Sequence, residues 1–225
     1  MENLIERARI VQKFYDDFAP QYDQNRYQSP EQSLIDQAAQ KIFLKLTERT
    51  CFAGLKILDV GCGTGRLAKL FSERGADVLG IDPSETMLST ARKKVPGALF
   101  QKGNVLNLKF YETFDMVVCS QVLTHLHQYQ KPLQEMKKAL KQNGAIIIDI
   151  RNSISLKNLF ALLRQKLVKS AIENDYKPHF TNIFTIKRLC KKIGLRVTQW
   201  GGLNCSGKKI PKIFQQTLII KMVKD

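Results

Sequence analysis

The sequence predicts an α/β fold whose core is a doubly wound, mostly parallel sheet. From Leu55 to Ile150, short apolar runs typical of strands alternate with segments of helical spacing, the pattern of consecutive βαβ units. The runs over 57–60 and 77–82 are apolar almost throughout and end in glycine or proline turns. Such runs are expected for strands that helices cover on both faces. At 225 residues, with 44% apolar and 25% charged residues, the chain is of ordinary composition for a globular protein.

Two helices, near residues 3–18 and 30–48, are expected before the sheet, and the first strand then leads into a glycine turn. Apolar Ile57, Leu58 and Val60 precede three alternating glycines, and helical spacing resumes at Arg66. Glycines there let the backbone turn sharply and let a ligand approach closely. Asp59 would repel a pyrophosphate and attract a cationic amine or sulfonium. The turn therefore predicts a nucleotide-cofactor site that favours a cation.

This stretch, from Ile57 to Ala68, resembles motif I of the class I S-adenosylmethionine-dependent methyltransferases. The resemblance implies a Rossmann-like, seven-stranded sheet with one antiparallel strand, the last, and helices on both faces. It also implies S-adenosyl-L-methionine as cofactor and S-adenosyl-L-homocysteine as product. The residues of this motif expected at the cofactor are Asp59, Gly61, Cys62, Gly63 and Gly65.

The second strand, over 77–82, ends in Asp82, and Pro83 and Ser84 open the next helix. Asp82 follows Gly61 by about 20 residues, the separation at which a carboxylate binds ribose hydroxyls in doubly wound folds. The alternative is that Asp82 caps a turn before Pro83. Pro83 is counted with the cofactor residues, and Met87 either packs on the adenine or fills the core.

The third strand and its exit, over 98–105, carry Asn104 where the resembled family usually has an acid that holds the adenine amino group. An asparagine amide can both accept from and donate to the adenine edge. The alternative is a turn asparagine after Gly103. Val105 is grouped with Asn104 as a cofactor residue.

The segment from Phe114 to Leu126 predicts the fourth strand and the loop that leaves its carboxyl end, the edge where ligands bind in such sheets. Ser120 is expected to line the cofactor, and the resemblance implies that its carbonyl holds the methionine amine. His125 lies in a VLxHL segment that similar methyltransferases often carry, and it is the candidate general base. A structural histidine bonded to backbone is the alternative.

The segment from Phe14 to Arg26 resembles the YDxxAxxYD lead-in of small-molecule members of the family, which covers the cofactor. Tyr15 and Tyr22 would close over the methionine moiety, and Arg26 would pair with its carboxylate. Tyr22 is also a candidate catalytic residue. A plain packing helix is the alternative.

A fifth strand is expected over 145–150, followed by amphipathic helices over 154–173, a helix over 185–193 and last strands over 195–200 and 214–223. The expected organisation is one domain over residues 1–225. Its parts are lid helices over 1–50, a cofactor-binding core over 51–150, inserted helices over 151–184, and a C-terminal helix with the last strands over 185–225. The inserted part is expected to select the acceptor.

The composition excludes several classes of protein. There is no apolar stretch long enough to span a membrane and no signal peptide at the start, so a cytoplasmic protein is expected. The five cysteines are widely spaced without a CxxC pair, so neither a disulfide framework nor a metal site is predicted. The net charge of +16 fits an anionic partner, such as nucleic acid, an anionic membrane surface, or a phosphorylated or carrier-bound substrate.

The favoured function is methyl transfer to oxygen, nitrogen or carbon of a small molecule, sugar, lipid or carrier-tethered acceptor. Two alternatives stay open: an RNA methyltransferase that uses the basic surface, and a non-catalytic cofactor-binding protein of the same fold.

Overall fold

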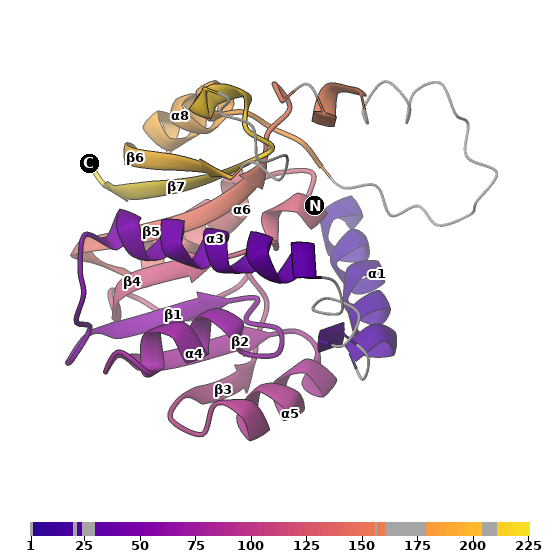
Figure 1. Cartoon of the computed structure of the whole chain (residues 1–225), viewed down its shortest axis with the longest axis vertical. Helices are drawn as coiled ribbons and strands as arrows, with labels where there is room; N and C mark the ends of the chain where they lie inside the picture. Colours follow the sequence, from indigo (N-terminus) through magenta and orange to yellow (C-terminus); the bar gives the residue numbers. More distant parts are fainter. Residues whose placement is uncertain (1, 20–21, 24–29, 156, 161–178, 204–210) are drawn as a thin grey trace.

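The computed structural model describes residues 2–19, 22–23, 30–155, 157–160, 179–203 and 211–225 (Figure 1). Its strands form one seven-stranded sheet in the order β3-β2-β1-β4-β5-β7-β6. The strands are β1 (Lys56–Val60), β2 (Asp77–Asp82), β3 (Leu99–Lys102), β4 (Phe114–Cys119), β5 (Leu140–Arg151), β6 (Leu195–Leu203) and β7 (Thr217–Lys224). Strand β7 runs antiparallel to both of its neighbours, and the pairs among β1 to β5 are parallel. The predicted fold class is confirmed.

Helices cover both faces of this sheet and bury two separate cores. On one face, α3 (Pro30–Thr47), α4 (Arg66–Ser72) and α5 (Glu85–Lys94) contribute residues such as Phe43, Phe71 and Leu88 to one core. On the other face, α6 (Gln130–Ala139) and α8 (Ile183–Lys192) contribute Leu133 and Ile186 to the second core. Strand residues buried from both sides explain the continuous apolar runs of the sequence.

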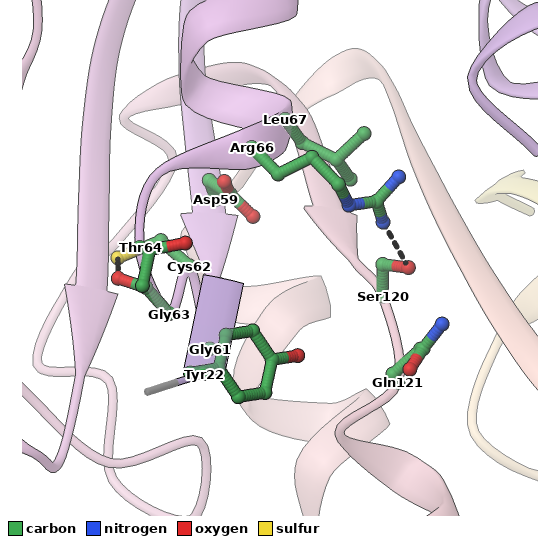
Figure 2. A pocket seen from close by; sticks show the side chains of 10 residues that line it. All are labelled: Tyr22, Asp59, Gly61, Cys62, Gly63, Thr64, Arg66, Leu67, Ser120 and Gln121. Carbon is green, nitrogen blue, oxygen red and sulfur yellow. Dashed lines mark hydrogen bonds between the residues drawn. The ribbon is translucent and has the colours of Figure 1, made fainter. Parts of the chain in front are cut away.

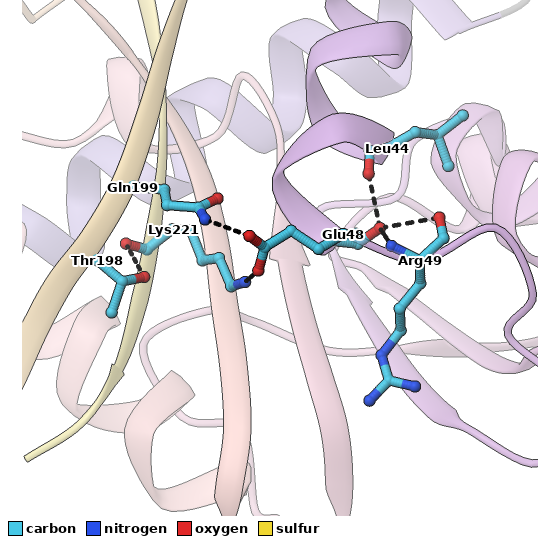
Figure 3. A network of polar contacts seen from close by, with 7 residues as sticks. Leu44, Glu48, Arg49, Thr198, Gln199 and Lys221 are labelled. Atoms are coloured by element: carbon cyan, nitrogen blue, oxygen red, sulfur yellow. Dashed lines mark hydrogen bonds and ion pairs between the residues drawn. The ribbon is translucent and has the colours of Figure 1, made fainter.

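The C-terminal end of α3 is tied to the last two strands of the sheet (Figure 3). Gln199 of β6 and Lys221 of β7 donate hydrogen bonds of 2.6 and 2.9 Å to the two carboxylate oxygens of Glu48. The hydrogen bond and charge of Lys221, with the Gln199 bond, lower the pKa of the Glu48 carboxyl. These contacts fix α3 across the sheet, with its Asp36 side chain buried near the glycine turn.

The sheet changes winding direction between β1 and β4, where one half of the strand order leads to β3 and the other to β5. Ligands of open α/β sheets bind at the carboxyl ends of the strands beside such a point. Helix α1 (Glu2–Phe18) lies over this edge and contacts α5 and the 3₁₀ helix η2 (Leu123–His125). The fold therefore brings the N-terminal helix to the predicted cofactor site.

The starts of two strands differ from the sequence expectation. Strand β5 begins at Leu140, before the predicted 145, because Leu140 pairs with Phe114 and the register shifts before Ala145. Strand β7 begins at Thr217, because Asn152 donates to the carbonyls of Ile213 and Gln215 and the 3₁₀ helix η3 (Lys212–Phe214) precedes the strand.

Between β3 and β4 the expected alternation of strand and helix also fails, because residues 103–113 form turns and no helix. Most of the helical prediction over 154–173 lies outside the described residues, although 157–160 are helical. Among the described helices, none is both long and apolar enough to cross a membrane. Three of the four described cysteines are buried, and Cys51 is exposed.

Candidate cofactor and methyl-transfer site

The glycine turn between β1 and α4 has the conformation that only glycine adopts easily. Gly61, Gly63 and Gly65 all have positive φ values, of 70°, 52° and 87°. A Cβ on Gly61 would lie 2.1 Å from Cγ2 of Val122, whereas a Cβ on Gly63 would meet no atom within 4 Å. The turn therefore packs tightly against the loop after β4 at Gly61 and opens onto free space at Gly63, where a ligand has room to approach.

The carboxyl end of β1 holds the buried acid predicted to attract a cation. Asp59 is 2% exposed, and its Oδ2 accepts a 3.0 Å hydrogen bond from the backbone N–H of Ala68. Burial raises the pKa of Asp59 to about 7, and the charge of Arg66 opposes the rise only in part. The charge of this buried carboxylate is only partly balanced by Arg66, so a positively charged ligand beside it would stabilise the ionised form.

Asp82 lies at the end of β2 with both carboxylate oxygens already engaged by backbone. Oδ2 accepts from the N–H of Gly63 and Oδ1 from the N–H of Ser84, each at 3.0 Å, so the turn role that the sequence left open is present. Burial raises the pKa of Asp82, and these two hydrogen bonds oppose the rise. Each carboxylate oxygen has a second lone pair that can accept from a ribose hydroxyl, and the ribose contact stays a prediction.

A first pocket lies directly against the glycine turn (Figure 2). Its walls come from β1, the turn, α4, the loop after β4 and the N-terminal segment, and they consist of Tyr22, Asp59, Gly61, Cys62, Gly63, Thr64, Arg66, Leu67, Ser120 and Gln121. The Oγ of Ser120 accepts from Nη2 of Arg66 at 2.9 Å and donates to Oδ2 of Asp149 at 2.7 Å. Ser120 thus lines a pocket beside the glycine turn, and its hydroxyl belongs to a partly buried polar chain, while its contact with the cofactor stays a prediction.

A second pocket of about 560 Å³, partly open to solvent, continues from the first under α1. Pro83, Met87 and Asp82 line one part of it, and Tyr15 and His125 line another. The Oη of Tyr15 lies 3.1 Å from Nε2 of His125, and the two rings meet edge to face at 5.5 Å. The structure therefore brings the predicted base and a predicted lid tyrosine to one cavity with the predicted ribose acid.

Asn104 lines a third pocket beside β3, together with Pro83 and Gln101. Its Oδ1 accepts from the N–H of Leu106 at 2.9 Å, which is the turn role given as the alternative. Val105 packs in the core at 8% exposure and lines none of the three pockets. The adenine contact of both residues stays a prediction.

Of the other predicted site residues, some line the first or second pocket and some do not. Tyr22 lines both the first and the second pocket, and its ring lies 6.0 Å from that of Tyr15. Cys62 lines the first pocket at 6% exposure, and burial raises the pKa of its thiol. Gly65 lines none of the three pockets, and a Cβ there would meet Val95, Ala91 and Phe100 at 3.1–3.4 Å. Arg26 lies outside the described residues.

The sequence analysis missed a set of polar side chains that hold the site together. Thr64 donates to Oδ1 of Asp23 at 2.8 Å, which joins the N-terminal segment to the glycine turn. Asp149, at the end of β5, accepts the N–H of Gln121 at 2.7 Å and holds that residue at a φ of 60°. Left-handed backbone costs a residue other than glycine about 1–2 kcal/mol, and such strain concentrates at functional sites. The signal available in the sequence was Asp149, an acid near the carboxyl end of another predicted strand at the same edge of the sheet.

The fold and the site together define a doubly wound α/β protein with adjoining pockets, the candidate cofactor site, at the carboxyl ends of β1, β2 and β4. Comparison with known proteins identifies the family. Residues 58–148 match the family described as "Methyltransferase domain". This match identifies residues 58–148 as a methyltransferase domain, in agreement with the resemblance of the glycine turn to motif I of the class I S-adenosylmethionine-dependent superfamily.

Curated relatives match parts of the chain at about 30% identity. The mitochondrial ubiquinone biosynthesis O-methyltransferase of Schizosaccharomyces pombe is 33% identical over 122 residues, 51% of this chain and 44% of that protein. The ubiquinone biosynthesis O-methyltransferase of Azoarcus is 28% identical over 164 residues, 67% of this chain and 68% of that protein. The alignment thus spans less than half the length of the first relative.

Solved structures show the same fold at low identity. Magnesium protoporphyrin IX methyltransferase from Synechocystis, solved with bound S-adenosylhomocysteine, superposes with a TM-score of 0.74 at 18% identity. The superposition covers 96% of this chain and 99% of that one. At this identity the likeness concerns the fold, over nearly the whole chain.

Proposed function

We propose that the protein transfers a methyl group from S-adenosylmethionine to a hydroxyl oxygen of a small-molecule acceptor. The observation that carries the proposal is the second pocket, in which the ribose-binding candidate Asp82 and the base candidate His125 line the same cavity. Methyl transfer to a hydroxyl needs cofactor and acceptor side by side, so the residue that binds the cofactor and the base that acts on the acceptor must line one cavity. The names of the curated relatives, O-methyltransferases of ubiquinone biosynthesis, support transfer to oxygen.

The residues of the glycine turn suit this cofactor. Gly63 opens onto space that a side chain would fill, and Asp59 offers a buried carboxylate to the methionine ammonium group. Asp82 would accept the ribose hydroxyls and Asn104 the adenine amino group. When bound, S-adenosylmethionine supplies a methyl group made electrophilic by the sulfonium sulfur.

His125 and Tyr15 would act on the acceptor. A hydroxyl is a weak nucleophile until a base takes its proton, and the proton would pass to the imidazole of His125. Tyr15, at 3.1 Å from Nε2, would orient the ring. Helix α1, which carries Tyr15, would keep water away from the reacting atoms because Val11, Gln12 and Tyr15 of this helix line the cavity.

Turnover of the His125→Gln variant tests the proposal. Formation of S-adenosylhomocysteine is measured over a panel of phenolic, catecholic and amine acceptors, with S-adenosylmethionine affinity measured in parallel. Loss of the base is expected to lower kcat by about 10²- to 10⁴-fold, with cofactor affinity within a factor of two. Full activity of His125→Gln would contradict the role of His125, and absence of cofactor binding by the wild type would contradict the proposal.

One observation favours the RNA alternative. Lys187, Arg188, Lys191 and Lys192 are exposed on α8, and within the described part of the chain none of them forms an ion pair. If this surface binds RNA, affinity falls steeply with salt, and Lys191→Gln with Lys192→Gln reduces the slope by about one to two. RNA binding without salt dependence would count against it.

A further inference from the structure

Arg66 is the cationic side chain of the first pocket, and no other residue that lines this pocket carries a positive charge. It is the first residue of α4, directly after the glycine turn, and its side chain is 16% exposed. In Figure 2 its guanidinium group lies on the same side of the pocket as Ser120, beyond Asp59. A guanidinium removed this far from water needs anionic partners.

Acids from two other elements hold Arg66 in place. Nη1 lies 2.9 Å from Oδ1 of Asp36 on α3, whose side chain is 7% exposed. Nη2 donates to Ser120, whose hydroxyl in turn donates to Asp149 at the end of β5. This chain, Asp36–Arg66–Ser120–Asp149, fixes the guanidinium between α3 and the loop after β4. Nη2 donates a hydrogen bond to Ser120 and Nη1 forms the ion pair with Asp36, so the five N–H donors of the guanidinium are not all engaged and a ligand can bind the others.

The first pocket therefore presents an acid and a fixed cation together. Asp59 is buried in the same wall, and it suits an ammonium group. A carboxylate is the matching partner of a guanidinium and binds it with directed, charge-assisted hydrogen bonds. An α-amino acid, which carries one group of each sign, is complementary to this pair.

We propose that Arg66 binds the carboxylate of the cofactor's methionine moiety, with Asp36 as the residue that positions its guanidinium. This inference rests on the proposed function and assigns one residue within that site. It differs from the sequence expectation, which gave the same carboxylate to Arg26. A purely structural tie between α3 and α4 is the competing explanation of the Asp36–Arg66 pair, and the two make different predictions for a ligand without a carboxylate.

The test measures calorimetric affinities for S-adenosylmethionine and for decarboxylated S-adenosylmethionine, which has the amine and the sulfonium but lacks the carboxylate. The variants are Arg66→Met, Arg66→Lys and Arg26→Met, with Lys69→Met as a matched control one turn further along α4. Lys69 is exposed and lines none of the three pockets. Thermal unfolding of each variant is recorded alongside.

Arg66→Met is expected to lose about 10- to 100-fold in affinity for S-adenosylmethionine, the range of a charge-assisted pair, and less than threefold for the decarboxylated ligand. Arg66→Lys keeps the charge, so its affinity for S-adenosylmethionine is expected to lie between those of the wild type and Arg66→Met. It replaces Arg66→Met in the test if that variant does not fold. Equal losses for both ligands, or selective loss in Arg26→Met alone, would overturn the assignment. If the wild type bound neither ligand, the proposed function itself would fail.

Discussion

Thr64 donates a 2.8 Å hydrogen bond to Asp23, and this bond joins the segment that follows α1 to the glycine turn of the cofactor site. Asp23 also pairs with Lys94 at the end of α5. Asp23 is therefore held by two elements that follow successive strands, β1 and β2, and it lies against the same turn that would hold the ligand.

Removing this bond is expected to weaken cofactor binding. Thr64→Val keeps the shape of the side chain but loses the donor, and one hydrogen bond to a charged group is worth about 1.5 kcal/mol. We expect the dissociation constant for S-adenosylmethionine to rise about tenfold by calorimetry. The control is Thr86→Val, an exposed threonine on α5. An unchanged affinity of Thr64→Val for S-adenosylmethionine would show that cofactor binding does not depend on the bond between Thr64 and Asp23.

Gly61 and Gly63, two of the three glycines of the turn, are expected to differ in their tolerance of alanine. Gly61→Ala places a methyl group against Val122, and such overpacking costs about 1–3 kcal/mol. Gly63→Ala meets no neighbour and is expected to fold better but to bind cofactor poorly, since its methyl group enters the pocket. Urea unfolding measures both, and Gly61→Ala with Val122→Ala should recover part of the loss. Equal stability of the two single variants contradicts the packing difference.

Asp59 is expected to make the protein less stable as pH rises toward neutrality. Its carboxyl has a pKa of about 7 when folded, against an ordinary value of 3.8. Between these values the folded state keeps a proton that the unfolded state releases, so the free energy of unfolding falls with increasing pH. Burial is the main cause of this high pKa. The charge of Asp82 adds to the rise, whereas the guanidinium of Arg66 lowers the pKa in part.

The variant Asp59→Asn removes the ionisation. Relative to wild type it should gain stability at pH 8, up to about 4 kcal/mol, with a smaller gain at pH 5, while losing affinity for S-adenosylmethionine. Urea unfolding at the two pH values measures the difference, with Asp77→Asn, an exposed acid of β2, as control. The same stability difference at both pH values would be incompatible with a titrating Asp59.

The sequence predicted the elements whose signals are local. Strands β1 and β2 are mainly apolar and buried between helix layers, and the alternating glycines predict the sharp turn that the structure shows. Asp59 and Asp82 lie at the carboxyl ends of β1 and β2, and Ser120 and His125 follow β4, so sequence position alone brings them to one edge.

The parts that escaped prediction depend on contacts between distant segments. The chain Asp36–Arg66–Ser120–Asp149 draws one residue from each of four segments, and no spacing in the sequence marks it. The early start of β5 depends on pairing with Phe114, which overrides the polar run after Leu140. The late start of β7 follows from carbonyl groups held by Asn152.

The most direct test of the account is calorimetric titration of the wild type, Asp82→Ala and Asp77→Ala with S-adenosylmethionine and S-adenosylhomocysteine. Asp77 lies at the opposite end of the same strand, and its side chain is exposed. We predict binding of both ligands by the wild type and by Asp77→Ala. Asp82→Ala should bind about 100-fold more weakly, the effect of two charge-assisted hydrogen bonds of about 1.5 kcal/mol each. Wild-type affinity in Asp82→Ala, or no binding by any of the three proteins, would contradict the account.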